Sequence, residues 1–60
     1  MKTYDVTIAT WDRRQQTTVR VFAPNPDAAT RDDALFETAE RRFERGLFVV
    51  LLVKEVRPGV

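Results

Sequence analysis

Carboxylates are the main side chains in this sequence that could perform acid–base or metal chemistry. The chain has no Cys and no His, which removes thiolate and imidazole metal ligands and every nucleophile that depends on a His base. Its aspartates are scattered, at Asp5, Asp12, Asp27, Asp32 and Asp33. No spacing among them assembles a metal site or pairs a general acid with a base, and the only two glycines, Gly46 and Gly59, form no phosphate-binding loop. We therefore predict that the protein is not an enzyme and needs no metal or cofactor.

Arginines next to aromatic residues indicate a different kind of chemistry, the binding of single-stranded nucleic acid. Arg13 and Arg14 follow Trp11 at the tip of a predicted hairpin, and Arg20 and Phe22 lie on its second strand. Guanidinium groups bind phosphates, and exposed aromatic rings stack on bases. The net charge of only +1 and the lack of an RNP-type motif disfavour this role. Nucleic-acid binding is therefore the alternative to the function predicted below.

The elements that position these side chains belong to one small domain. Sixty residues bury only about 60% of their unfolded surface, so partner subunits, metals or disulfides often add stability at this size. Without Cys, association with a partner is the easiest of these supports. The apolar run at residues 47–53 is shorter than the roughly 20 residues that span a bilayer, and the N-terminal residues do not resemble a signal peptide. We predict a cytoplasmic protein without a membrane anchor.

Two segments near the N-terminus alternate polar and apolar residues, a period of two that predicts strands. They cover about residues 3–11 (TYDVTIATW) and 17–23 (TTVRVFA), separated by the polar DRRQQ. We expect an antiparallel hairpin with a loop of four or five residues, because neither Asn-Gly nor Asp-Gly is present. A third strand is expected at about residues 47–56, where the sequence is apolar at every position from 47 to 53.

The intervening residues predict one helix at about 26–45. Asn25 is a good N-cap and Pro26 suits the first helical position, although Thr30 begins a capping-box-like pattern and offers a second start. Gly46 is the expected end. The whole is an α+β fold of ββαβ order, a three-stranded sheet with one helix on one face. Because the connection from the second to the third strand is a crossover, these two strands should be parallel, with the first strand between them.

One face of this helix is apolar and should pack on the sheet. Its residues are Ala28, Ala29, Leu35, Phe36, Ala39 and Phe43. Asp32 falls in the middle of this face. If the helix begins at Thr30, Asp32 lies in a frayed first turn; otherwise it is a buried carboxylate or one that faces a partner.

The segments YDVTI, VRVFA and RRFERGLFVVL, with helically spaced alanines between the last two, resemble the DpnD/PcfM-like group of small mobile-element proteins. The resemblance covers residues 4–51. It implies a phage or plasmid setting, in which proteins of this size often bind host machinery, and it supplies no catalytic motif. The size and strand–helix order are also similar to those of some anti-CRISPR proteins.

The third strand is too apolar to be covered by one helix. Either residues 47, 49, 51 and 53 or residues 48, 50 and 52 should face the helix, and the sequence leaves the choice open. The other set, beside Trp11 and Phe22, is expected to form an apolar patch that a monomer rarely exposes, unless strand twist, arginine stems and the C-terminal tail cover it. The predicted interface comprises Trp11, Arg13, Arg14, Arg20, Phe22, Phe48, Val50 and Leu52, with the aromatic residues as anchors and the arginines as a polar rim.

A second candidate surface is an acidic row along the helix. It comprises Asp33, Glu37, Glu40 and Glu44, spaced four, three and four residues apart. Such a row could contact a basic partner, and its simpler interpretation is a solvated face. The sequence as a whole predicts a non-catalytic protein-interaction module that forms a homodimer and binds a host or partner protein, as an anti-CRISPR-like inhibitor does.

Overall fold

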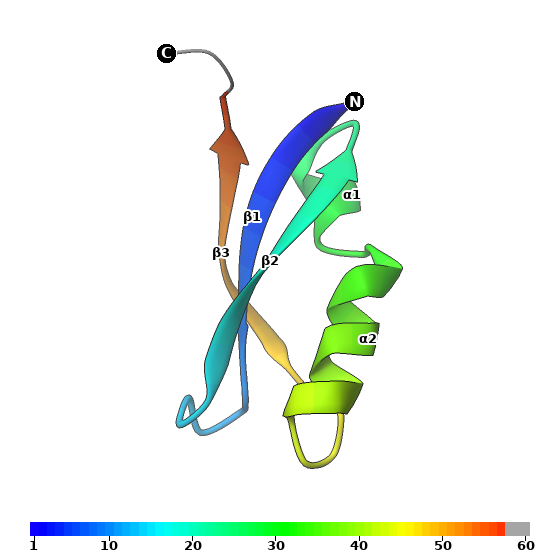
Figure 1. The fold of residues 1–60 in the computed structure, drawn as a ribbon. Coiled ribbons are helices and arrows are strands. Elements are labelled where there is room, and N and C mark those ends of the chain that lie inside the picture. The colour runs from blue at the N-terminus through cyan, green and yellow to red at the C-terminus, as the bar shows by residue number, and fades with distance from the viewer. Residues whose placement is uncertain (58–60) are drawn as a thin grey trace.

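The computed structural model describes residues 1–57, which form a strongly twisted three-stranded sheet with two helices on one face (Figure 1). The elements are β1 (Lys2–Ala9), β2 (Gln16–Ala23), α1 (Pro26–Ala29), α2 (Asp33–Arg42) and β3 (Val49–Val56). The sheet order is β2-β1-β3, and both neighbours run antiparallel to β1. The predicted α+β class and ββαβ order are confirmed, and so is the central place of the first strand.

Alternation along the strands separates the two faces of the sheet. Tyr4, Val6 and Ile8 of β1 are all buried toward the helices. In the ladder, Val6 lies between Val19 of β2 and Val53 of β3, and both neighbours pack against the core. The β-branched side chains of this row fit the pleated surface and bury apolar area across all three strands.

The helical region is interrupted, so the prediction of one helix over 26–45 is wrong in its middle. As predicted, Asn25 caps the first segment: its Oδ1 accepts from the Ala28 N–H at 2.8 Å, with Pro26 opening the helix. The Thr30 hydroxyl then donates back to the Asp27 carbonyl at 2.7 Å, and Asp32 Oδ1 accepts from the Ala34 N–H at 2.9 Å. These side chains offer the backbone an alternative to helical hydrogen bonds. Asp32 is therefore the N-cap of α2, an outcome that neither of its two predicted placements described.

The second helix also ends earlier than predicted. It stops at Arg42, because Phe43 adopts extended backbone angles while its N–H still donates to the Ala39 carbonyl at 2.8 Å. This conformation accompanies burial of the Phe43 ring, which is only 3% exposed. A turn closed by the Gly46 N–H and the Phe43 carbonyl, at 3.0 Å, then reverses the chain, and Gly46 has a positive φ of 66°.

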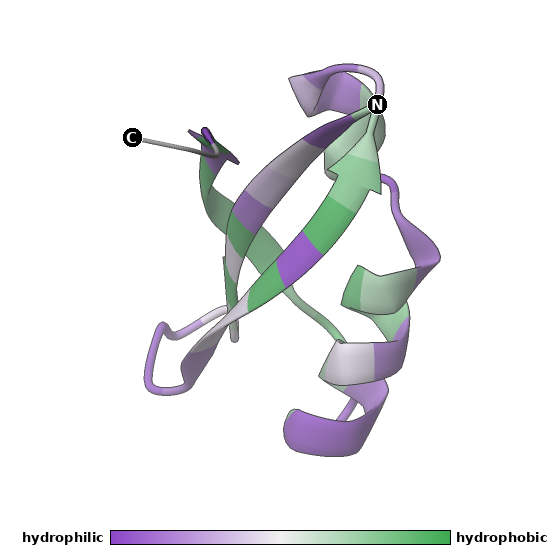
Figure 2. Ribbon diagram, turned by 45° about the horizontal axis from the view of Figure 1, so that its top comes forward, coloured by the Kyte–Doolittle hydropathy of each residue, from purple (hydrophilic) through white to green (hydrophobic). Residues whose placement is uncertain are grey.

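The helical residues that pack on the sheet are those of the predicted apolar face, with the exception of Phe36 (Figure 2). Ala29, Leu35 and Ala39 are fully buried as predicted. Phe36 is half exposed and instead contacts Phe48 edge-on, with ring centroids 5.1 Å apart. This aromatic pair closes the rim of the core beside the start of β3.

A β-bulge changes which residues of β3 face the helices. The register pairs Leu52 with Thr7 but Val50 with Ile8, so Leu51 has no partner on β1. The extra residue reverses the alternation along the strand. Val53 and Phe48, five residues apart, consequently both pack against the core. Neither predicted set is correct as a whole, because each assumed unbroken alternation.

The buried hydroxyl of Tyr4 provides a first test of this core. Tyr4 is 1% exposed, and its hydroxyl has no hydrogen-bond partner among residues 1–57. Leaving such a group unpaired costs roughly 1–3 kcal/mol. We expect Tyr4→Phe to raise the free energy of unfolding by about 1 kcal/mol in urea titrations, and a loss of stability would show that the hydroxyl is hydrogen-bonded.

Candidate functional site

The face of the sheet opposite the helices does not carry the continuous apolar patch that the sequence predicts. The register places Phe22, Thr3 and Val56 in one row across the strands. The next row contains charged residues only, namely Arg20, Asp5 and Lys54. This charged row divides the face between its apolar residues.

The charged row is held by a bidentate ion pair between β1 and β2. Arg20 donates from Nε to Asp5 Oδ1 at 2.9 Å and from a terminal nitrogen to Oδ2 at 3.2 Å. The hydrogen bonds from Arg20 hold the pKa of the Asp5 carboxyl below its ordinary value. Arg20 is therefore committed to its own sheet and is not a free cation for a ligand.

The aromatic residues predicted as anchors lie in three different places. The first strand ends at Ala9, so Trp11 lies in the β1–β2 loop, where it is 84% exposed. Phe22 pairs with Thr3 at the other end of β1, roughly 20 Å away at ~3.3 Å per strand residue. Phe48 packs on the helix side. These three rings cannot form one anchor cluster.

The exposed apolar surface is concentrated instead along β3, an edge strand of the sheet. Three successive residues, Val50, Leu51 and Leu52, are 37%, 37% and 58% exposed. Leu47, just before the strand, is 68% exposed, and Figure 2 shows the hydrophobic colouring along much of this strand. We call residues 50–52 the β3 edge segment.

The β1–β2 loop is an ordered structure built around Asp12. Its Oδ1 accepts from the Thr10 hydroxyl at 2.7 Å and from the Arg14 N–H at 3.0 Å. The hydrogen bond from Thr10 is the largest of the effects that lower the pKa of Asp12, so the carboxylate is ionised at neutral pH. Because β1 ends at Ala9 and β2 begins at Gln16, the loop has six residues rather than the predicted four or five. A backbone hydrogen bond of 2.9 Å from the Thr10 N–H to the Gln15 carbonyl closes it.

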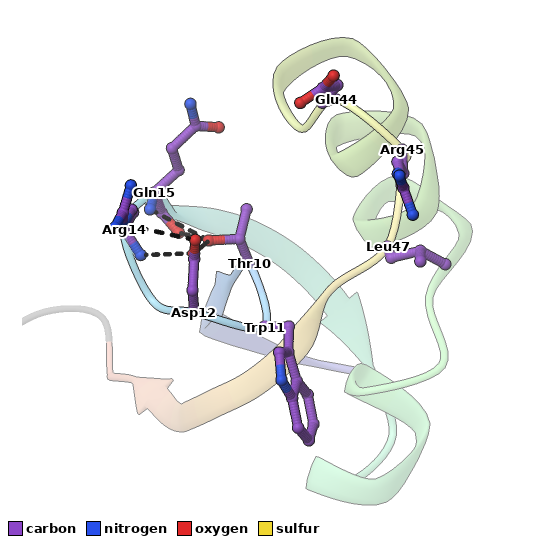
Figure 3. A pocket seen from close by; sticks show the side chains of 8 residues that line it. All are labelled: Thr10, Trp11, Asp12, Arg14, Gln15, Glu44, Arg45 and Leu47. Atoms are coloured by element: carbon purple, nitrogen blue, oxygen red, sulfur yellow. Dashed lines mark hydrogen bonds and ion pairs between the residues drawn. The ribbon is translucent and has the colours of Figure 1, made fainter.

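This loop faces the α2–β3 connection across an open cleft of about 370 Å³ (Figure 3). The loop contributes Thr10, Trp11, Asp12, Arg14 and Gln15, and the connection contributes Glu44, Arg45 and Leu47. A second cleft of about 390 Å³ is lined by Arg14, Gln15, Gln16, Arg42 and Phe43. Arg14 and Gln15 line both clefts, so the two clefts adjoin, and we call them together the hairpin track.

Sequence reasoning identified three of the eleven residues that line the hairpin track. Trp11 and Arg14 were predicted interface residues and Glu44 was predicted in the acidic row, whereas Arg42 and Arg45 were assigned to neither surface. A signal existed, because a central first strand antiparallel to the third must place the residues before β3 beside the loop after β1. In the structure Ala9 pairs with Val49 at this point.

The predicted acidic row is shorter than expected. Asp33, Glu37 and Glu40 lie on α2, but Glu44 lies in the turn after the helix. The three helical carboxylates are exposed, and none of them forms an ion pair with another residue of the described chain. Glu40 instead lies beside Gly46. No surface of four aligned carboxylates exists on this helix.

Within residues 1–57, no group of three or more Asp and Glu side chains is placed to hold a metal ion. Neither helix of this range has the length and hydropathy that a membrane crossing requires. No family model matches the chain, and neither a curated protein nor a solved structure matches it.

Proposed function

We propose that this protein is a non-catalytic interaction module that associates with a second copy of itself through β3. The observation that carries this proposal is the β3 edge segment, where three successive apolar residues are more than one third exposed. Within residues 1–57, no strand pairs with the outer edge of β3. An unpaired strand edge offers backbone N–H and C=O groups to another strand. Edge pairing replaces face-to-face packing as the mode of association, because the charged row interrupts the open face.

A second copy of the chain is a suitable occupant of this edge. In an antiparallel pair centred near Leu52, Lys54 and Glu55 of one copy face apolar residues of the other, so no like charges are opposed. A stable interface buries about 800 Å² on each partner, which is about one sixth of the 4732 Å² surface of the described chain. The β3 edge segment and Leu47 together supply four of the eight exposed large hydrophobic residues of the described chain.

Measurement of the mass in solution tests this proposal. We expect light scattering to give twice the 7.0 kDa chain mass at high protein concentration. Leu52→Lys should return the protein to a monomer, because a charge would replace an apolar side chain at the centre of the pair. Circular dichroism should remain unchanged, since Leu52 is 58% exposed.

Phe22→Lys is the matched control, because Phe22 is 65% exposed but lies on β2, the opposite edge of the sheet. It should leave the dimer intact. A wild-type chain that stays monomeric at millimolar concentration would refute the proposal. Equal dissociation by both substitutions would show that the open face, rather than the β3 edge, forms the contact.

A further inference from the structure

The positive charge of this protein is concentrated at one end, although the chain is nearly neutral. Residues 10–16 and 41–47 contain five of the ten basic residues and two of the nine acidic residues. These two segments therefore have a net charge of +3, and the rest of the chain has −2. Figure 1 shows that the β1–β2 loop and the α2–β3 connection lie at the same end of the molecule, away from the N-terminus. A ligand approaching this end meets an electropositive surface.

The arginines of this end are largely free to bind a ligand. Arg42 and Arg45 form no ion pair with another described residue, and the same is true of Arg13 and Arg41. Arg14 contacts Asp12 through Nε at 3.6 Å and is 87% exposed at the side chain. By contrast, Arg20 is engaged by Asp5. Planar guanidinium groups with unused donors suit phosphate oxygens.

An aromatic ring completes the hairpin track. Trp11 is 84% exposed and lines the same cleft as Leu47, Arg14 and Arg45. The exposed indole offers a flat apolar surface on a cleft that Arg14 and Arg45 also line. Nucleic-acid bases stack on such rings while nearby cations neutralise their phosphates. An acidic peptide would satisfy the arginines but not the indole. A duplex keeps its bases stacked internally and leaves the ring unused as well.

We propose that the hairpin track binds single-stranded nucleic acid, with a base on Trp11 and the backbone phosphates on Arg14, Arg45 and Arg42. Trp11 and Arg14 of this site belong to the arginine–aromatic pattern of the sequence. Arg20 and Phe22 of that pattern lie elsewhere, and their places are taken by Arg45 of the α2–β3 connection and Arg42 at the end of α2. It is separate from the β3 edge segment. The binding and the dimer proposed above can therefore succeed or fail independently.

Fluorescence anisotropy of a labelled single-stranded oligonucleotide of about 12 nucleotides, which covers a usual site size, tests this inference at low salt. We expect binding whose affinity falls with salt at a logarithmic slope of about −2, since three phosphate contacts contribute roughly 0.7 each. Trp11→Ala should weaken binding about tenfold or more. Arg14→Ala with Arg45→Ala should weaken it similarly and reduce the slope by about 1.4. The single Trp of the chain should also lose fluorescence on binding.

The matched control is Arg31→Ala with Lys54→Ala, which removes two positive charges outside the two segments and should change affinity less than twofold. No binding at low salt would refute the inference, and so would equal weakening by the control pair. If a duplex of the same length or a polyglutamate peptide binds as tightly, and Trp11→Ala has no effect on either, the track is a general anion surface and the proposal is wrong. Light scattering of the same variants keeps this result distinct from the dimer test.

Discussion

Phe43→Ala is expected to destabilise the protein by about 3–5 kcal/mol. The Phe43 ring is 3% exposed and belongs to the core cluster with Leu35 and Ala39. Truncating a buried phenylalanine to alanine costs about 3–5 kcal/mol. A domain of 60 residues has a total stability of roughly 3–9 kcal/mol at 0.05–0.15 kcal/mol per residue. The substitution therefore removes a large part of the free energy that holds the fold.

Urea denaturation followed by circular dichroism measures this loss. Phe22→Ala is the matched control, since it deletes the same atoms from a ring that is 65% exposed, and it should cost less than about 1 kcal/mol. Similar losses in the two variants would show that Phe43 is not buried in solution.

Gly46→Ala is expected to cost about 1–2 kcal/mol, because Gly46 has a φ of 66° in the left-handed region that residues with a Cβ adopt at about this cost. Space is also short, since a Cβ at this position would lie 3.3 Å from Glu40 Cγ. The turn that Gly46 closes carries the chain from α2 to β3. A strained turn would thus weaken the packing of both elements.

The reciprocal substitution is Arg13→Gly. Arg13 has a φ of 60° without being a glycine, so removing its Cβ should relieve backbone strain in the folded state. A glycine also increases the conformational entropy of the unfolded chain, which offsets part of this gain. We expect a net increase in stability of a few tenths of a kcal/mol. Thermal unfolding of both variants checks the pair. The assignment of the two left-handed positions is contradicted if Gly46→Ala is neutral or Arg13→Gly destabilises the protein.

The local elements were largely predictable because their signals lie within a few residues of one another. Alternation in TYDVTIA and TTVRVFA predicted β1 and β2, and Asn25 with Pro26 predicted the start of α1. The interruption was missed because Thr30 was considered only as a second possible start and Asp32 only as a residue of the first turn or of the apolar face. In the structure Thr30 is the C-cap of α1 and Asp32 is the N-cap of α2. The end of α2 was missed because burial of Phe43, a tertiary effect, overrides the helical propensity of the residues around it.

The candidate surfaces were harder to predict, since they depend on which segments meet. Arg14 and Arg45 are thirty-one positions apart, and only the pairing of Ala9 with Val49 brings their loops together. Arg20 was a plausible ligand-binding residue until Asp5 was found opposite it in the ladder. Exposed charges show their partners only when the strand register is known.

The sequence by itself determined the ββαβ order and the alternation along β1 and β2, because periodicity and capping act over short distances. It also determined that the chain holds more apolar residues than one helix can cover. The tertiary structure alone decided where that excess lies. The bulge at Leu51 turns both Val53 and Phe48 toward the helices and leaves Val50, Leu51 and Leu52 partly exposed on a free edge. One unpaired residue reverses the alternation of a strand, and only the partner strand reveals that it is unpaired.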